Sequence, residues 1–148
     1  MVPDRIEREI VIAAPVERVW EVVTGAEHLG AWFGDAGAEI DLRPGGAMVL
    51  RWKQYGVYRC VVEKVEPPRF FSFRGAVTAD TDSAPGNSTV VEFTLEPEEG
   101  GTRLRVVESG FDTLDVSPDE RRKFYEGNVG GWAAKLPELR DYAERVAA

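Results

Sequence analysis

The sequence predicts an α+β domain: a curled antiparallel sheet of about six to seven strands packs against one long C-terminal helix, with two short helices after the first strand. Two observations support this fold class. Apolar and polar residues alternate through most of residues 37–109, and the short turns between these segments favour consecutive antiparallel hairpins. After Ser117, apolar side chains recur at helical spacing over roughly 30 residues. One face of such a sheet needs a cover, and this helix is the only element large enough to provide it.

The composition indicates one soluble domain over residues 1–148. Acidic residues outnumber basic ones by 26 to 18, for a net charge of −8, so we expect no nucleic-acid partner and no attraction to anionic membranes. No apolar run approaches the roughly 20 residues needed to cross a bilayer, and the N-terminus lacks the apolar stretch of a signal peptide. These features together predict a cytoplasmic protein.

A single cysteine, Cys60, and a single histidine, His28, narrow the possible chemistry. One cysteine excludes an intramolecular disulfide and an all-cysteine metal site, and one histidine excludes a histidine-rich metal centre. His28 is expected to be exposed or to cap a helix. The sequence therefore predicts neither a metal nor a cofactor.

The N-terminal elements follow from local patterns. Residues 5–12 alternate with isoleucines on one side, which predicts the first strand. In "AAPVERVWEVV", Pro15 suits the first helical turn, and valines and a tryptophan recur at helical spacing. Gly25 is expected to end that helix, and residues 26–33 to form a second one closed by Gly34.

The central strands are predicted to share one apolar face. "RPGG" and "EEGG" mark turns, and the polar segment "TADTDSAPGNS" forms a longer loop. By alternation, the inward positions are Met48, Leu50, Trp52, Phe71, Phe73, Val91, Phe93, Leu104 and Val106. The strand that starts near Tyr58 is apolar on both faces, so alternation does not decide which face points inward. The inward assignment of Tyr58 and Cys60 is therefore a hypothesis.

The C-terminal helix begins with a strong signal and then contains residues that weaken helices. Ser117 is expected to be the N-cap, followed by Pro118 at the first helical position and Glu120 closing a capping box. Gly130, Gly131 and Pro137 follow inside the helix, at a combined cost of roughly 5 kcal/mol. Either the helix breaks at Gly130, or a neighbouring feature requires these residues.

Six short strings resemble the START-like, or SRPBCC, superfamily of helix-grip proteins, and within it the bacterial homologues of the activator of heat-shock-protein-90 ATPase. In order they are "APVERVWEVVT" (14–24), "WF" (32–33), "DLRPGG" (41–46), "VEPPRFFSF" (65–73), "ESGF" (108–111) and "GGW" (130–132). The resemblance implies a C-terminal helix that crosses the concave face of the sheet and leaves a cavity. Gly130 and Gly131 would then allow a close approach to the sheet or leave room for a ligand, and Pro137 would bend the helix.

The resemblance and the strand alternation together predict a ligand-binding set. Its members are Trp32, Phe33, Met48, Leu50, Trp52, Tyr58, Phe71, Phe73, Val91, Phe93, Val106, Glu108, Phe124, Asn128 and Trp132. The competing hypothesis is that these residues form an ordinary hydrophobic core, because an aromatic stripe is usually packing.

Glu108 is the most informative member of this set. It shares strand parity with Val106, so its carboxyl group should point inward, where burial would raise its pKa and suit it to acid or base chemistry. It could instead reach water at the rim or pair with an arginine. Many relatives carry a histidine at this position, so any chemistry that needs an imidazole is in doubt here.

The expected function is the binding of a small hydrophobic or lipid-like molecule in the cavity. One alternative is a polyketide cyclase or aromatase-like enzyme with Glu108 as its acid or base. Another is a protein-interaction module, with a chaperone as partner by family analogy only. An exposed strand edge could also form a homodimer.

Overall fold

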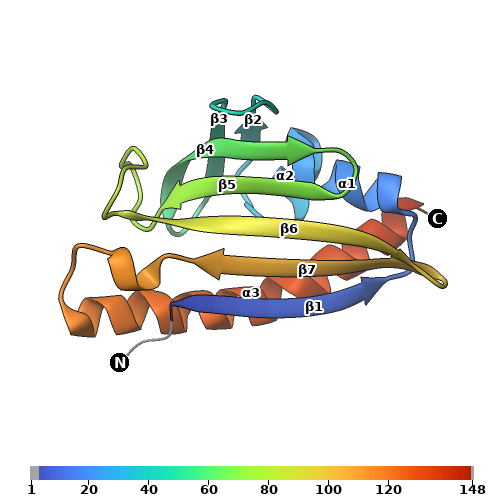
Figure 1. The fold of residues 1–148 in the computed structure, drawn as a ribbon. Coiled ribbons are helices and arrows are strands. Elements are labelled where there is room, and N and C mark those ends of the chain that lie inside the picture. Colours follow the sequence, from blue (N-terminus) through green and yellow to red (C-terminus); the bar gives the residue numbers. More distant parts are fainter. Residues whose placement is uncertain (1–3, 148) are drawn as a thin grey trace.

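The computed structural model describes residues 4–147 and confirms the helix-grip architecture, with a curled sheet and a long helix against it (Figure 1). The seven strands form one antiparallel sheet in the order β1-β7-β6-β5-β4-β3-β2. The elements are β1 (Arg5–Ile12), α1 (Val16–Thr24), α2 (Ala26–Trp32), β2 (Ala38–Ile40), β3 (Ala47–Trp52), β4 (Gly56–Glu66), β5 (Phe70–Ala76), β6 (Ser88–Glu98), β7 (Gly101–Ser109), the short helix η1 (Phe111–Thr113) and α3 (Pro118–Ala147). None of the helices in residues 4–147 is long and apolar enough to cross a membrane.

The first and last strands of the sequence lie side by side. β1 pairs antiparallel with β7, from Arg5 opposite Ser109 to Ile12 opposite Thr102. This pairing places β1 at one edge of the sheet and β2 at the other. Helix α1 begins one residue later than expected, because Pro15 adopts an extended conformation and serves as its N-cap residue.

The alternation predicted for the central strands is observed as rows of residues across the sheet. Phe73 of β5 is paired with Val91 of β6, which is paired with Glu108 of β7. One step along the strands, Phe71, Phe93 and Val106 form the next row on the same face. The inward face of the sheet is therefore one continuous surface, with Glu108 in one of its rows.

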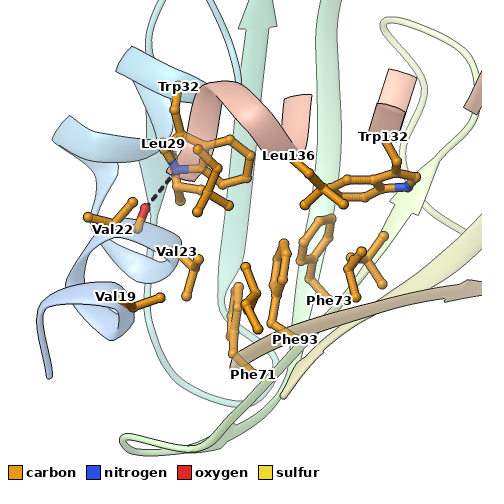
Figure 2. Packing of buried hydrophobic residues seen from close by; sticks show 14 of the residues in the cluster. Val19, Val22, Val23, Leu29, Trp32, Phe71, Phe73, Phe93, Trp132 and Leu136 are labelled. Atoms are coloured by element: carbon orange, nitrogen blue, oxygen red, sulfur yellow. Dashed lines mark hydrogen bonds between the residues drawn. The ribbon is translucent and has the colours of Figure 1, made fainter. Parts of the chain in front are cut away.

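Helices α1 and α2 cover one end of this surface and complete a packed core (Figure 2). The rings of Phe71 and Phe93 are stacked, with centroids 6.2 Å apart, and Trp32 meets Phe93 edge to face at 6.5 Å. The Trp32 indole N–H donates to the carbonyl oxygen of Val22 over 2.8 Å, so its polar atom is satisfied within the core.

Helix α3 is continuous over 30 residues, which confirms the prediction of one long helix and excludes the alternative of a break at Gly130. Half of the predicted capping box is present: the Glu120 backbone N–H donates to Ser117 Oγ over 3.2 Å. The Glu120 carboxylate accepts from the Ser117 hydroxyl, also over 3.2 Å, and not from the Ser117 backbone N–H. Pro137 lies inside the helix with its side chain exposed. The helix is thus uninterrupted although it contains Gly130, Gly131 and Pro137.

Candidate ligand-binding site

A pocket of about 480 Å³ lies between the inward face of the sheet and the first half of α3. Its wall is formed by strands β3 to β7, the start of the loop after β5, the end of α2 and one side of α3. The lining residues are Phe33, Leu50, Trp52, Tyr55, Tyr58, Cys60, Phe73, Gly75, Ala76, Val77, Thr89, Val91, Glu108, Lys123, Phe124, Gly127, Asn128, Gly131, Trp132 and Lys135. Most of these side chains are apolar or aromatic, as is usual for small-molecule sites.

One side of the pocket is a chain of aromatic rings in mutual contact. Tyr58 meets Trp52 edge to face with centroids 5.4 Å apart, and Trp52 meets Phe33 edge to face at 5.5 Å. Phe33 in turn lies 5.5 Å from Trp132 of α3 and stacks on Trp32 at 4.7 Å. Each ring is held by its neighbours, so this wall is preformed.

Glu108 provides the only carboxyl group in the pocket wall, and it is buried, with 5% of its surface exposed. Its Oε2 accepts hydrogen bonds from Thr89 Oγ1 at 2.6 Å and from Asn128 Nδ2 at 2.8 Å. Its Oε1 accepts one from Trp132 Nε1 at 2.8 Å. β6 and α3 thus both hold the carboxyl group in place, so it is a buried part of the pocket wall and not an exposed group at the rim.

Burial raises the pKa of Glu108, and the hydrogen bonds from Thr89, Trp132 and Asn128 lower it by a smaller amount. No arginine or lysine in residues 4–147 forms an ion pair with this carboxyl group, so the hypothesis of an arginine partner is wrong. The site therefore holds a carboxyl group among neutral donors in apolar surroundings. Such a group can act as an acid or base, or bind a group that donates a hydrogen bond.

A row of four residues on α3 borders the pocket. Lys123, Gly127, Gly131 and Lys135 follow one another at four-residue spacing, so they lie on one side of the helix. A Cβ atom added at either glycine of this row would meet no other atom within 4 Å. The prediction of a close approach between the helix glycines and the sheet is therefore wrong. Open space lies beside them, which agrees with the alternative that they leave room.

Gly130 differs from Gly131 because it does not line the pocket. It is exposed, and a Cβ atom added to it would also meet nothing within 4 Å. Gly130 and Gly131 are thus adjacent glycines with equal steric freedom, of which only Gly131 borders the pocket. This difference makes them a matched pair for experiments.

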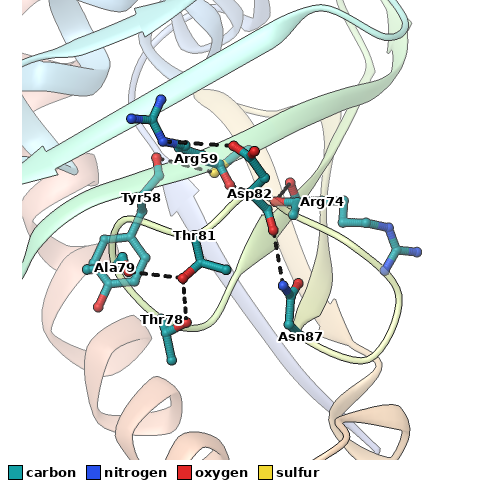
Figure 3. Close-up of polar contacts among 10 residues, drawn as sticks. Tyr58, Arg59, Arg74, Thr78, Ala79, Thr81, Asp82 and Asn87 are labelled. Carbon is teal, nitrogen blue, oxygen red and sulfur yellow. Dashed lines mark hydrogen bonds and ion pairs between the residues drawn. The ribbon is translucent and has the colours of Figure 1, made fainter.

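The polar loop between β5 and β6 is attached beside the β4 wall of the pocket (Figure 3). Ser83 Oγ donates to the carbonyl oxygen of Arg59 over 2.6 Å. The backbone N–H of Asp80 donates to the carbonyl oxygen of Val57 over 2.7 Å. Within the loop, Asn87 Nδ2 donates to the carbonyl oxygen of Asp82 over 3.0 Å. These bonds hold the loop next to Tyr58.

Ten of the fifteen predicted site residues line the pocket. They are Phe33, Leu50, Trp52, Tyr58, Phe73, Val91, Glu108, Phe124, Asn128 and Trp132. The other five belong to the core and do not line it: Trp32, Met48, Phe71, Phe93 and Val106. The strand alternation correctly placed four of these, Met48, Phe71, Phe93 and Val106, on the inward face, whereas Trp32 belongs to α2. All five are buried in the packed core.

The sequence analysis left several lining residues out of the predicted site. Thr89 shares strand parity with Val91, so its inward position could have been inferred from alternation. Lys123 and Gly127 lie beside Phe124 and Asn128 on α3 and could have been found from the helical period. The others are Tyr55, Cys60, Gly75, Ala76, Val77, Gly131 and Lys135.

His28 lies outside this pocket and is neither fully exposed nor a cap. It is half-buried on α2, and its Nδ1 lies 2.7 Å from the Tyr142 hydroxyl near the end of α3. The prediction that His28 is exposed or caps a helix is therefore wrong, because α3 extends over α2 and its Tyr142 contacts the imidazole. Within residues 4–147, no group of three or more His, Cys, Asp or Glu side chains is arranged to hold a metal ion.

Comparison with known proteins places this architecture in a family. The family model described as "Activator of Hsp90 ATPase homolog 1-like protein" matches residues 13–144. A crystal structure of a protein from Mesorhizobium loti is similar, with 26% sequence identity, a TM-score of 0.78 and coverage of 95% of this chain and 97% of that chain. A solution structure of a protein from Bacillus halodurans has 30% identity, a TM-score of 0.74 and coverage of 97% and 100%.

A third neighbour is known as a dimer. The solution structure of the Aha1 dimer from Colwellia psychrerythraea has 22% identity, a TM-score of 0.73 and coverage of 95% of this chain and 96% of that chain. At this identity it supports the fold alone. A search of curated proteins found no match.

Proposed function

Since the chain belongs to the family of activator of Hsp90 ATPase homolog 1-like proteins, we propose that it binds a small, mainly apolar molecule in the pocket between the sheet and α3. The observation that carries this proposal is the pocket of about 480 Å³ with one buried carboxyl group, Glu108, in an aromatic wall. This volume falls within the range of roughly 300–1,000 Å³ found for small-molecule sites.

Small residues around the pocket support binding over simple packing. Gly127 and Gly131 line it on α3, and a Cβ atom added at either would meet nothing within 4 Å. Each helical glycine costs about 1 kcal/mol relative to alanine. A protein that only needed a packed core could fill this space with larger side chains and gain stability.

Thermal unfolding in the presence of small apolar compounds tests the proposal. A compound present at 100 times its dissociation constant stabilises the folded state by about 2.7 kcal/mol. For a domain of this size we expect Tm to rise by roughly 5–10 °C. Failure of every compound in a panel of naphthalenes, medium-chain alcohols and fatty acids to raise Tm would contradict small-molecule binding.

A matched pair of variants locates the binding. Gly131→Phe places a ring beside the pocket, and Gly130→Phe places the same ring one residue away, where it does not border the pocket. We expect Gly131→Phe to weaken binding of an active compound at least tenfold and Gly130→Phe to leave it within twofold. Equal effects of the two variants would place the ligand elsewhere.

Catalysis is a second candidate function, favoured by the raised pKa of Glu108 in its apolar surroundings. In a cyclase-like reaction this carboxyl group would act as the acid or base. Incubation with a short aromatic β-keto compound, followed by mass spectrometry, tests for a product. Loss of product formation in Glu108→Gln, with thermal unfolding unchanged, would favour an enzyme over a binding protein.

Interactions with other proteins complete the proposal. The Colwellia neighbour is a dimer, and both sheet edges of this chain, β1 and β2, have an unpaired side in the structure. Light scattering over a range of concentrations checks whether this chain forms a homodimer. A contact with a chaperone rests on the family likeness, and co-purification from cell extract checks it. A cytoplasmic location is proposed from the composition of the sequence.

A further inference from the structure

The hydrogen-bonding capacity of Glu108 is incompletely used. An ionised carboxylate offers about four acceptor sites, and the protein occupies two on Oε2 and one on Oε1. Glu108 also lines the pocket. A bound molecule could therefore donate a hydrogen bond to the remaining acceptor site, which is on Oε1.

In its ionised form this carboxylate also has no counterion among residues 4–147. Its three donors, Thr89, Asn128 and Trp132, are all neutral side chains. The two lysines that line the pocket do not supply the charge, because Lys135 pairs with Glu138 at 3.0 Å and Lys123 is exposed. A buried carboxylate gains most from a partner that brings both a hydrogen bond and a positive charge.

The remaining wall of the pocket suits an organic cation. Seven aromatic side chains line the same pocket as Glu108: Phe33, Trp52, Tyr55, Tyr58, Phe73, Phe124 and Trp132. The faces of aromatic rings attract ammonium groups, most strongly where water is excluded. Apolar rings or chains attached to that ammonium would gain from the same wall through burial.

We infer that the pocket selects an apolar molecule with one protonated amine, which donates a hydrogen bond to Glu108 Oε1 and packs against the aromatic wall. This inference rests on the proposed function, because it names the chemical class of ligand for the same site. A neutral alcohol would fill the free acceptor site but leave the charge without a counterion. A carboxylic acid at this position would place two acidic groups together and is disfavoured.

Three probes of nearly equal size and shape test this inference: 1-naphthylmethylamine, 1-naphthalenemethanol and 1-ethylnaphthalene. Their affinities are measured at pH 7 by quenching of tryptophan fluorescence and by thermal unfolding. A hydrogen bond to a charged group predicts binding of the amine roughly 10- to 100-fold tighter than binding of the ethyl compound, with the alcohol between them. This comparison uses the unaltered protein, so it does not depend on a variant that folds.

Glu108→Gln and Glu126→Gln provide the second arm, because Glu126 is an exposed residue of α3 that does not line the pocket. We expect Glu108→Gln to lower the affinity for the amine at least tenfold and to leave that for the ethyl compound within about threefold. Glu126→Gln should leave the order of the three probes unchanged. Equal or weaker binding of the amine than of the ethyl compound would overturn the inference while the proposed function stands. Failure of all three probes and of the wider panel to bind would instead contradict the proposed function.

Discussion

The Trp132 indole N–H donates a hydrogen bond to Glu108 Oε1 over 2.8 Å and so joins the middle of α3 to the end of β7. Both residues are buried, with 5% of each exposed. The same carboxyl group also binds Thr89 on β6 and Asn128 one turn earlier on α3. A single side chain therefore connects two strands to the helix that covers them, and it does so in the wall of the pocket.

Trp132→Phe removes this donor while keeping an aromatic ring. Because Oε1 would lose its one protein partner, we expect the free energy of unfolding to fall by about 1–3 kcal/mol, with a further loss from the smaller ring. Urea denaturation at pH 7 measures the change.

Trp52→Phe is the control for this substitution. Trp52 also donates its indole N–H, to the carbonyl oxygen of Phe33 over 2.9 Å, but it is only partly buried and its acceptor is uncharged. We expect a loss of about 1 kcal/mol. If Trp52→Phe costs as much as Trp132→Phe, the bond to Glu108 contributes nothing beyond an ordinary hydrogen bond.

Stability should depend on pH through Glu108. Burial raises its pKa in the folded state above the ordinary value of 4.5, so the folded protein holds this proton more tightly than the unfolded chain does. Its contribution to stability is then fully present below about pH 4.5 and is lost as pH rises through the folded-state pKa. The slope is at most about 1.4 kcal/mol per pH unit.

Glu108→Gln isolates this effect from the other titrating groups. Urea denaturation of both proteins from pH 4 to pH 8 gives the difference between their unfolding free energies at each pH. We expect the unaltered protein to lose stability relative to Glu108→Gln as pH rises above about 4.5. A difference that stays constant with pH would show that the folded-state pKa of Glu108 is not raised.

The strand alternation was sufficient to place Glu108 correctly, because each strand has a fixed period of two and no bulge intervenes between Leu104 and Glu108. The helical period likewise placed Asn128 and Trp132 on the side of α3 that meets the sheet. The position of β1 beside β7 was not predicted, because no local pattern encodes which strands pair.

The extent of the pocket could not be predicted in the same way. Phe73 lines it, whereas Phe71, two residues earlier on the same face, is wholly buried near Trp20 and Phe93. Periodicity assigns both side chains to one face but does not say which part of that face a helix fills. Likewise, the partners of Glu108 depend on which donors come within 3 Å of it, which is set by tertiary packing.

Cys60 should be chemically inert in the folded protein although it lines the pocket. Burial raises the pKa of its thiol to about 12. At pH 8 the fraction present as reactive thiolate would be on the order of 10³-fold smaller than for an exposed cysteine with a pKa near 8.5. We expect iodoacetamide to modify the native protein very slowly and the urea-unfolded protein at an ordinary rate. Equal rates would show that the pocket wall opens readily.

Alanine at the helix glycines should stabilise the protein. Gly130 and Gly131 lie within α3, and a Cβ atom at either meets nothing within 4 Å, so the substitution has no steric cost. We expect Gly130→Ala and Gly131→Ala each to raise the free energy of unfolding by about 1 kcal/mol, as measured by urea denaturation. A loss of stability in either variant would mean that the fold itself requires glycine at that position.

Ligand binding then separates the two variants. Gly130→Ala should bind any compound that raises Tm as tightly as the unaltered protein does, because Gly130 does not line the pocket. Gly131→Ala adds a methyl group beside the pocket, so its affinity should fall for compounds that fill the space next to α3. Stabilisation by both substitutions, with weaker binding only in Gly131→Ala, would indicate that glycine at 131 serves the pocket at the expense of the helix.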